Sequence, residues 1–312
     1  MKDFYKINRV LKELIGYEIT INSNEAFHKM IEKINTMNFN AVLLEKDFWL
    51  TVVLIYIANV LPELRFKWWT SLNKIYYPYY RLSEDLDFTF PVNEEIVNSN
   101  KKRIAFAHVV REKIKKIATL TWRELNPDSV HHKKALWLKE LHNKEHSYLK
   151  YILKYPSTYT DELQTIKIEL TYTPKQFFES RNETIKSIFI NPITESPLFR
   201  EQNIQCLSVE EMVTEKCRAA LTRRKPAIRD FYDLWYLQEH WIDIFANKEI
   251  IAKKCLEITE LKRTSFWNYE ELEHQIETEL KPVLQKESNF DLKKIYNQIM
   301  ELQKEMVEKL KN

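Results

Sequence analysis

Two segments of the chain alternate polar and apolar residues with a period of two, a pattern typical of β-strands. The first runs from Asp85 to Phe90, and its apolar positions are Leu86, Phe88 and Phe90. The second runs from Thr165 to Tyr172, and its apolar positions are Ile166, Ile168, Leu170 and Tyr172. Side chains two residues apart share a face of a strand, so each strand is predicted to have one buried face and one polar face.

Most of the remaining pattern is helical, with hydrophobic residues spaced three and four apart. It predicts helices over residues 24–34, 43–60, 70–75 and 101–118, and strands over 65–68 and 147–154. From Ser208, which resembles a helix N-cap, the pattern is helical to the end of the chain. We therefore predict an α+β protein, with a mixed sheet flanked by helices in residues 1–205 and a helical C-terminal domain in residues 206–312.

Composition is that of a globular protein rather than a disordered one, since 44% of the 312 residues are hydrophobic and 30% are charged. The net charge of +3 does not by itself demand a nucleic-acid partner. Basic runs near residues 101–103, 115–116 and 223–225 form either a patch or ordinary solvated helix faces.

Compartment is indicated by the cysteines and the apolar runs. The three cysteines (Cys206, Cys217 and Cys255) have neither disulfide nor metal-site spacing, and no signal peptide is visible, so a reducing cytoplasm is expected. The longest apolar run, Phe48–Leu61, is too short to span a bilayer and predicts a buried helix. No membrane association is expected.

The polar face of the first strand contains two acids, Asp85 and Asp87, followed by Thr89. Two like charges on one strand face repel each other, and a divalent cation reverses that repulsion. Carboxylate oxygens are the ligands that Mg²⁺ prefers. Asp-x-Asp therefore suggests a Mg²⁺ site, although an exposed acidic strand end or turn would show the same short pattern.

A third acid, Glu169, stands on the polar face of the second strand, beside Lys167. If the two strands are neighbours with the same face outward, Asp85, Asp87 and Glu169 converge. Such a cluster could hold two metal ions about 3.5–4 Å apart, the arrangement that clamps both oxygens of an in-line phosphoryl displacement. The adjacency of the strands is an assumption at this point.

These residues carry a resemblance to the AbiEii/AbiGii-type nucleotidyltransferase toxins, which include the MenT-like enzymes. In that family a strand leads into Gly-Gly-Thr-Ser/Ala-Leu-x-Lys, followed by Arg-x-Ser-x-Asp-x-Asp. The positions that fit as they stand are Thr70, Ser71, Leu72, Lys74, Arg81, Ser83, Asp85 and Asp87. Each match alone is weak, and the order of the set makes it fairly specific.

Further matches extend the resemblance from about Glu45 to Leu237. Upstream, residues 45–51 (EKDFWLT) resemble the family's Glu-Lys-Asp-aromatic-Trp helix start. Downstream, Lys167-Ile168-Glu169 matches the third acid, and residues 215–219 and 229–234 match the late helical motifs. The resemblance implies a nucleotidyltransferase-fold sheet with a helical C-terminal domain.

The resemblance also implies an activity, the transfer of a nucleoside monophosphate from an NTP to an acceptor with release of pyrophosphate. Asp85, Asp87 and Glu169 would hold Mg²⁺, and Glu169 could instead activate the acceptor hydroxyl. The nucleotide would be bound within the set Trp68, Trp69, Thr70, Ser71, Lys74, Arg81 and Ser83, in which Ser71 and Lys74 contact phosphates and Arg81 pairs with an acid or a phosphate.

Two residues of the C-terminal half acquire roles only through the resemblance. Lys216 is expected to be a phosphate-binding or catalytic lysine, and Asp230 a catalytic acid or its support. Both would line the cleft that the three acids face. Without the resemblance, Lys216 would be interpreted as a helix-surface lysine, and Asp230 with Asp233 as an acid pair at a helix start.

By the same resemblance, the biological role is the toxin of a toxin–antitoxin or phage-defence pair. The implied partners are an NTP substrate, a tRNA 3′ end as a possible acceptor, and a cognate antitoxin protein.

One departure concerns the phosphate loop, where Trp68-Trp69 replaces the family's Gly-Gly. Glycines there let the backbone approach a triphosphate, because they lack Cβ and accept positive φ. The chain has 1 glycine in 312 residues. Either the gene uses UGA codons that its organism translates as glycine, or the phosphate loop has been lost. In the second case the protein is a catalytically inactive relative that binds nucleotide, RNA or antitoxin.

Overall fold

The computed structural model describes residues 4–36, 38–90, 99–125, 138–143, 147–171, 176–223, 225–256, 269–284 and 289–311. Tyr172 and Arg224, which the sequence analysis used, lie outside these ranges. The chain divides into two compact units. Unit 1 is Met1–Gln176 with Ser180–Leu207, and unit 2 is Phe177–Glu179 with Ser208–Asn312. The domain boundary predicted after residue 205 lies close to this division.

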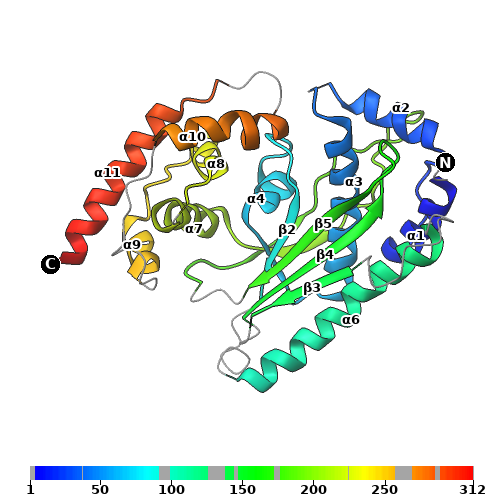
Figure 1. The fold of residues 1–312 in the computed structure, drawn as a ribbon, viewed down its shortest axis with the longest axis horizontal. Helices are drawn as coiled ribbons and strands as arrows, with labels where there is room; N and C mark the ends of the chain where they lie inside the picture. Colours follow the sequence, from blue (N-terminus) through cyan, green and yellow to red (C-terminus); the bar gives the residue numbers. More distant parts are fainter. Residues whose placement is uncertain are drawn as a thin grey trace. The chain divides into compact units, whose positions relative to one another are not determined.

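Unit 1 is built on a mixed seven-stranded sheet with the strand order β3-β4-β5-β2-β1-β7-β6. β2 runs parallel to β5 and antiparallel to β1, and β5 is antiparallel to β4. Figure 1 shows β2, β5, β4 and β3 side by side in this order. The strands are β1 (Arg65–Lys67), β2 (Asp85–Thr89), β3 (Leu138–His142), β4 (Tyr148–Pro156), β5 (Leu163–Thr171), β6 (Arg181–Thr184) and β7 (Asn203–Cys206).

The alternation in the sequence becomes two different sheet faces. One face is apolar and buried, and its central side chains are Phe66, Leu86, Phe88, Tyr151, Ile168 and Leu170. Helices cover this face. Trp49 of α3 (Ala41–Val60) packs against Tyr155 of β4 at 5.4 Å between ring centroids, and α6 (Asn100–Leu125) lies along β3 and β4. The opposite face holds the polar positions of β2 and β5, and four of them, Asp85, Asp87, Lys167 and Glu169, are half-exposed.

Two helices of unit 1 begin directly after a capping residue. Ser23 accepts a hydrogen bond from the backbone N–H of Ala26 and begins the helix that the sequence predicts there. Asn40 caps the long buried helix predicted from residue 43. The helix predicted over 70–75 is a short α4 that continues into a π-helical turn, η1. The elements are α1 (Phe4–Ile15), α2 (Asn24–Ile34), α3 (Ala41–Val60), α4 (Trp68–Ser71), η1 (Leu72–Tyr76) and α6 (Asn100–Leu125).

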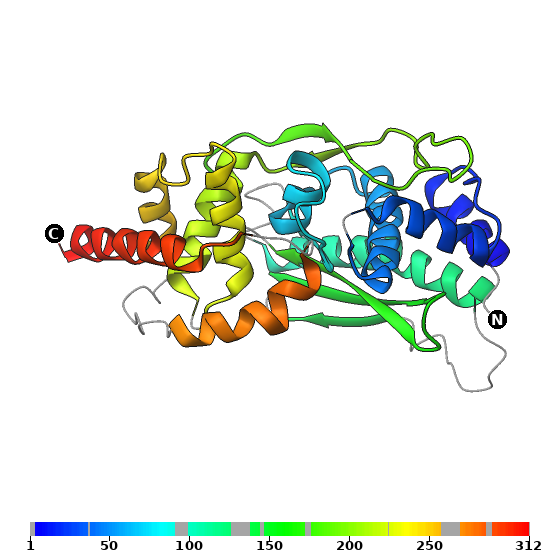
Figure 2. The same ribbon diagram turned by 90° about the horizontal axis from the view of Figure 1, so that it is seen from above.

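Unit 2 is helical, as the sequence pattern predicts. Ser208 caps α7 by accepting a hydrogen bond from the N–H of Glu211 at 3.3 Å. α11 contacts both α8 and α7, and Figure 2 shows it lying across them. The elements are α7 (Val209–Thr222), α8 (Ile228–Glu239), α9 (Lys248–Leu256), α10 (Tyr269–Gln275), η4 (Ile276–Leu280), η5 (Lys281–Val283) and α11 (Leu292–Lys311). No helix within the described ranges combines the length and the apolar character needed to cross a membrane.

Two helices end on left-handed residues of very different kinds. α1 ends at Gly16, the chain's single glycine, with φ +84°. α8 ends in the same way at Trp241, with φ +66°, and the next N–H, of Ile242, bonds back to the carbonyl of Leu237 at 3.0 Å. This is the helix end at which glycine is strongly preferred, because a Cβ is strained at positive φ. The Trp241 side chain is 95% exposed, so packing does not compensate for the strain.

We predict that Trp241→Gly stabilises the protein by about 0.5–1 kcal/mol, since it removes the left-handed strain and loses no buried area. Urea denaturation followed by circular dichroism measures the change. Trp241→Ala is the matched control, because it removes the same ring but keeps a Cβ at positive φ. Equal stability of the two variants would show that the backbone at this position is not strained.

Candidate active site

A row of charged side chains crosses the polar face of the sheet in unit 1. The strand register pairs Asp87 of β2 with Lys67 of β1 on one side and with Glu169 of β5 on the other. Lys150 of β4 is the next neighbour, opposite Glu169. Directly opposite residues share a sheet face, so Lys67, Asp87, Glu169 and Lys150 form a continuous line, called here the charged row. The strand adjacency assumed in the sequence analysis is present.

Asp85 lies on the same face, two residues before Asp87. Its Oδ1 atom is buried, makes no hydrogen bond, and lies 3.6 Å from the ammonium nitrogen of Lys167. Burial raises the pKa of Asp85, while the positive charges of Lys167 and Lys46 oppose the rise. The carboxylate therefore retains an oxygen with lone pairs available to a cation.

Glu169 is held by a lysine in this structure. Its Oε1 atom lies 2.6 Å from the ammonium nitrogen of Lys150, which donates a hydrogen bond to it. Burial alone would lower the pKa of Lys150, but the hydrogen bond and the charge of Glu169 outweigh it and raise that pKa. Within the described part of the chain, no three His, Cys, Asp or Glu side chains are grouped so as to hold a metal ion. The strands bring the three predicted acids together, and their carboxylates do not form a metal cluster in this arrangement.

The Asp85–Asp87 pair nevertheless fits a divalent cation. Both side chains offer carboxylate oxygens on one strand face, and the buried Oδ1 of Asp85 has no hydrogen-bond donor. Hard divalent ions take such oxygens as ligands, and their charge offsets the repulsion between the two carboxylates. Asp85 and Asp87 could therefore hold a divalent metal ion.

The segment expected to bind phosphates, residues 68–71 and called here the phosphate segment, begins directly after β1. It lies on the far side of β2 from Glu169. Trp68 has φ +64°, a conformation that is a genuine outlier for a bulky residue. Its ring lies 5.7 Å from that of Trp69 and 5.3 Å from the ammonium of Lys67. The backbone at residue 68 thus has the geometry that a glycine would adopt without strain.

One hydroxyl group connects this segment to the acid strand, and two others nearby make no hydrogen bond within the described chain. The Thr70 hydroxyl donates a hydrogen bond to the backbone carbonyl of Asp85, which fixes the segment against the start of β2. The hydroxyl oxygens of Ser71 and Ser83 are buried and make no hydrogen bond among the described residues. Unsatisfied buried hydroxyls are uncommon in native proteins, and two of them belong to the segments that precede β2.

Lys74 has a different place from the one expected. Its side chain is 0% exposed, and its ammonium donates hydrogen bonds to Asp47 at 2.6 Å, Thr51 at 2.8 Å and the Tyr79 hydroxyl at 3.0 Å. An ammonium has three N–H donors, so all of them are used. Burial lowers the pKa of Lys74, and the Asp47 carboxylate opposes this shift. Here Lys74 holds the segment to α3 and has no N–H left for the phosphate that the resemblance assigned to it.

Arg81 is buried as well, and it packs between aromatic rings. Its guanidinium lies 5.6 Å from the ring centroids of both Trp69 and Tyr80, and it donates a hydrogen bond to the carbonyl of Leu82. A guanidinium stacked on an indole is stabilised by the ring's negative face. The contact ties Trp69 to the turn that leads into β2.

In unit 2 the predicted residues form a cluster of their own. Lys216 on α7 is 1% exposed, which excludes the interpretation as a surface lysine, and it donates a hydrogen bond to Asp233 on α8 at 2.5 Å. Asp230 lies 3.7 Å from Lys216 and 3.0 Å from Arg223. The late motifs of the sequence therefore meet within this unit. That Lys216 and Asp230 line the same cleft as the three acids stays a prediction.

Two cations close to the acids, Lys46 and Lys150, were not predicted as site residues from the sequence. Lys46 of α3 lies 3.6 Å from Glu84, and burial lowers its pKa while Glu84 and Asp85 oppose the shift. Lys150 was not singled out either, although it stands at a polar position of an alternating strand. That signal was present in the sequence; the register that places Lys150 against Glu169 was not.

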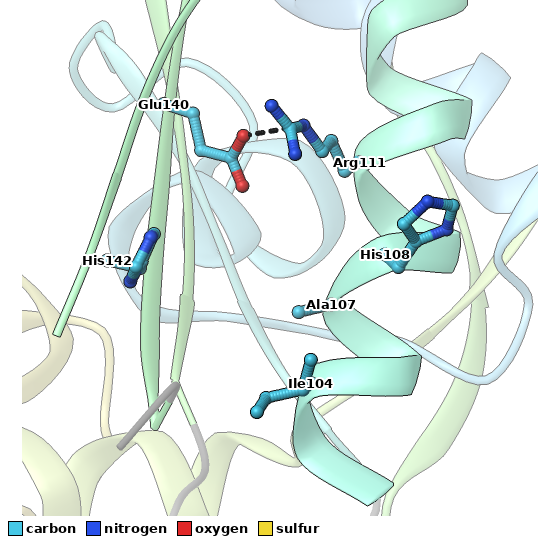
Figure 3. Close-up of a pocket in the computed structure, with 6 residues that line it drawn as sticks. All are labelled: Ile104, Ala107, His108, Arg111, Glu140 and His142. Carbon is cyan, nitrogen blue, oxygen red and sulfur yellow. Dashed lines mark ion pairs between the residues drawn. The ribbon is translucent and has the colours of Figure 1, made fainter. Parts of the chain in front are cut away.

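A separate pocket of about 360 Å³ lies between α6 and β3. Figure 3 shows Arg111 of α6 pointing toward Glu140 of β3, with 2.8 Å between Nε and the carboxylate. Glu140 is paired with the buried Tyr151, so it stands on the apolar side of the sheet. The pocket is therefore on the opposite face from the charged row and is not part of the candidate active site.

A model of the family described as "Nucleotidyl transferase AbiEii toxin, Type IV TA system" matches residues 62–309. The chain belongs to this AbiEii family. The matched span contains the phosphate segment, both acid strands and the buried lysine cluster of α7 and α8.

Two solved structures are similar in shape over most of the chain. JHP933 from Helicobacter pylori has 17% sequence identity, covers 93% of this chain and 94% of its own, and gives a TM-score of 0.42. A second H. pylori protein, described as a candidate nucleotidyltransferase, has 16% identity, covers 93% and 97% of the two chains, and also gives 0.42. No curated protein matches the chain.

Membership in the AbiEii family establishes the enzyme class as nucleotidyl transferase and the role as a toxin of a toxin–antitoxin system. It implies an NTP substrate and an antitoxin partner. Nucleotidyl transferases generally use divalent metal ions. The predicted fold class is confirmed, with a mixed sheet and flanking helices in the AbiEii protein.

We predict that Asp47→Ala destabilises the protein by about 3–5 kcal/mol, because it leaves the ammonium of Lys74 buried without its counter-charge. Urea denaturation gives the free energy of unfolding. The double variant Asp47→Leu/Lys74→Met should recover most of the loss, since neither charge is then buried. A loss below about 1 kcal/mol for Asp47→Ala would mean that this ion pair does not hold the phosphate segment in place.

Proposed function

We propose that this member of the AbiEii family transfers a nucleoside monophosphate from an NTP to a hydroxyl group of an acceptor, with Mg²⁺ bound by Asp85 and Asp87. The observation that carries this proposal is the order of parts across unit 1. The segment 68–71 follows β1, the acid pair stands on the adjacent β2, and Glu169 stands on β5. A triphosphate on that segment would place its α-phosphate over β2.

In the proposed reaction, the acceptor hydroxyl oxygen forms a bond to the α-phosphorus of the NTP. The bond from that phosphorus to the oxygen bridging the α- and β-phosphates breaks, and pyrophosphate leaves with the electron pair. Glu169 takes the hydroxyl proton, since its carboxylate lies beside Asp87 on the neighbouring strand. When bound, the metal would orient the triphosphate and offset the charge that develops on it.

Ser71 and Ser83 are proposed to donate hydrogen bonds to phosphate oxygens, because both hydroxyls are buried near the start of β2 and make no bond within the described chain. Lys216 and Asp230 are proposed to contribute from unit 2, as the family motifs suggest. The ion pair of Lys216 with Asp233 would then hold the ammonium in one orientation until a phosphate competes for it.

For the acceptor we propose a tRNA 3′ end, which offers the required hydroxyl next to phosphates. The site of action would then be the cytoplasm, where NTPs and tRNA are abundant, and the three free, buried cysteines are compatible with it. A role in phage defence is a further proposal that follows from the toxin–antitoxin family alone.

A second candidate function, RNA or antitoxin binding without catalysis, is favoured by one specific observation. The indoles of Trp68 and Trp69 occupy the segment where backbone N–H groups would meet the triphosphate.

The backbone favours the transferase instead. The positive φ of Trp68 and of Trp241 supports glycine as the natural residue at these positions, and UGA codons there would explain the tryptophans.

In the Trp68→Gly/Trp69→Gly protein, replacing Asp85 or Asp87 by Asn should reduce labelled-nucleotide transfer by at least about 100-fold, because the metal loses a charged ligand. Thermal stability should change little, as no core volume is removed. Asp161→Asn, on the exposed turn before β5, is the control and should keep full activity. If the Asp85 variant transfers nucleotide at the normal rate, the metal assignment is wrong.

Trp68→Gly/Trp69→Gly should create Mg²⁺-dependent NTP binding that the tryptophan form lacks, measured by isothermal titration calorimetry. Trp68→Ala/Trp69→Ala is the matched control, since it removes both rings but keeps a Cβ at positive φ, and it should bind more weakly. Full activity of the tryptophan form would refute the steric argument. A folded double-glycine variant that binds no NTP would count against the transferase function itself.

A further inference from the structure

The strand order of unit 1 gives the charged row two chemically different sides. The phosphate segment follows β1, so an NTP bound there directs its leaving pyrophosphate toward β1. Attacking and leaving oxygens stand roughly in line across the transferred phosphorus. The acceptor therefore has to approach from the opposite side of β2, which is the side of β5 and β4.

On that side, Lys150 is the cation in contact with Glu169. It stands on β4, directly opposite Glu169, and its side chain is 22% exposed, so it is within reach of a bound molecule. Its ammonium contacts the carboxylate to which we assign the acceptor's proton, at 2.6 Å. A group that close to Glu169 is also close to whatever Glu169 contacts.

The acceptor in the proposed function is the end of a nucleic-acid chain, and its hydroxyl lies within a few bonds of the preceding phosphate. A lysine beside the hydroxyl's base is therefore placed to contact that phosphate. An ammonium has three N–H donors, and the structure uses one of them on Glu169. Lys150 could contact Glu169 and an acceptor phosphate together.

We propose that Lys150 binds a phosphate of the acceptor nucleic acid and thereby aligns the acceptor hydroxyl with Glu169. This inference rests on the proposed function and assigns to Lys150 a recognition role that is separate from the binding of NTP. Without acceptor, Lys150 neutralises Glu169. With acceptor, its charge is shared between the carboxylate and the phosphate.

The test uses the full-length Trp68→Gly/Trp69→Gly protein as the reference, total deacylated bacterial tRNA as the acceptor, and Mg²⁺-NTP. Lys150→Met should raise the KM for tRNA about tenfold, as expected for the loss of one charge-assisted hydrogen bond. NTP affinity, measured by calorimetry, should remain within twofold. Ser71→Ala should show the reverse, with weaker NTP binding and an unchanged KM for tRNA.

Salt dependence supplies a readout that needs no catalysis. Removing one lysine–phosphate interaction at a single-stranded end makes the slope of log affinity against log salt shallower by about 0.7. Lys150→Met should show this reduction in tRNA binding measured by fluorescence anisotropy, and Lys150→Arg should retain the reference slope. Lys154→Met is the matched control, because Lys154 lies on the same strand and the same face, four residues further along, and it should bind tRNA as the reference does.

The outcomes separate this inference from the proposed function. If the reference labels tRNA while Lys150→Met keeps its KM and salt slope and loses only kcat, Lys150 merely holds Glu169 and the inference is wrong, though the function stands. If the reference binds NTP but never labels or binds tRNA, the proposed acceptor is wrong and the assignment of Lys150 falls with it. A raised KM and a reduced slope for Lys150→Met, rescued by Lys150→Arg, support the inference.

Discussion

The buried ion pair between Lys74 and Asp47 is the constraint on which the rest of the candidate active site depends. Both side chains are fully excluded from solvent, so each charge would be very costly without the other. The pair joins the helix α3 to the turn η1 that follows the phosphate segment, and the Tyr79 hydroxyl also contacts both partners. Because η1 cannot move away from α3 without separating two buried charges, the pair restrains the position of the adjoining segment 68–71 relative to α3.

Two further contacts transmit this constraint to β2. The Thr70 hydroxyl bonds to the carbonyl of Asp85, and Arg81 stacks on Trp69 just before the strand begins. The segment, the turn and the acid pair are thus one connected structure. In this structure Lys74 holds the turn η1 to α3 and has no N–H donor left for a ligand.

Much of the fold was predictable because its signals are local. Alternation identified β2 and β5 and their polar faces, and Ser23 and Ser208 marked helix starts by their capping chemistry. The contact between Lys150 and Glu169 was not predictable, because a period of two gives the face of a strand and not its neighbour or register. The burial of Lys74 was missed for a related reason, since lysine is almost always exposed and its partner Asp47 lies 27 residues away. Short strands such as β6 and β7 have too few residues for a pattern to be recognised.

The central claim is that a triphosphate binds on residues 68–71 with its metal between Asp85 and Asp87. A crystal structure of the Trp68→Gly/Trp69→Gly protein with Mn²⁺ and a non-hydrolysable NTP analogue tests it most directly. We predict an anomalous-scattering peak within about 2.0–2.3 Å of carboxylate oxygens from both aspartates, with the β- and γ-phosphates on the backbone of residues 68–71. A nucleotide bound elsewhere in the protein, with no Mn²⁺ between these two carboxylates, would contradict the account.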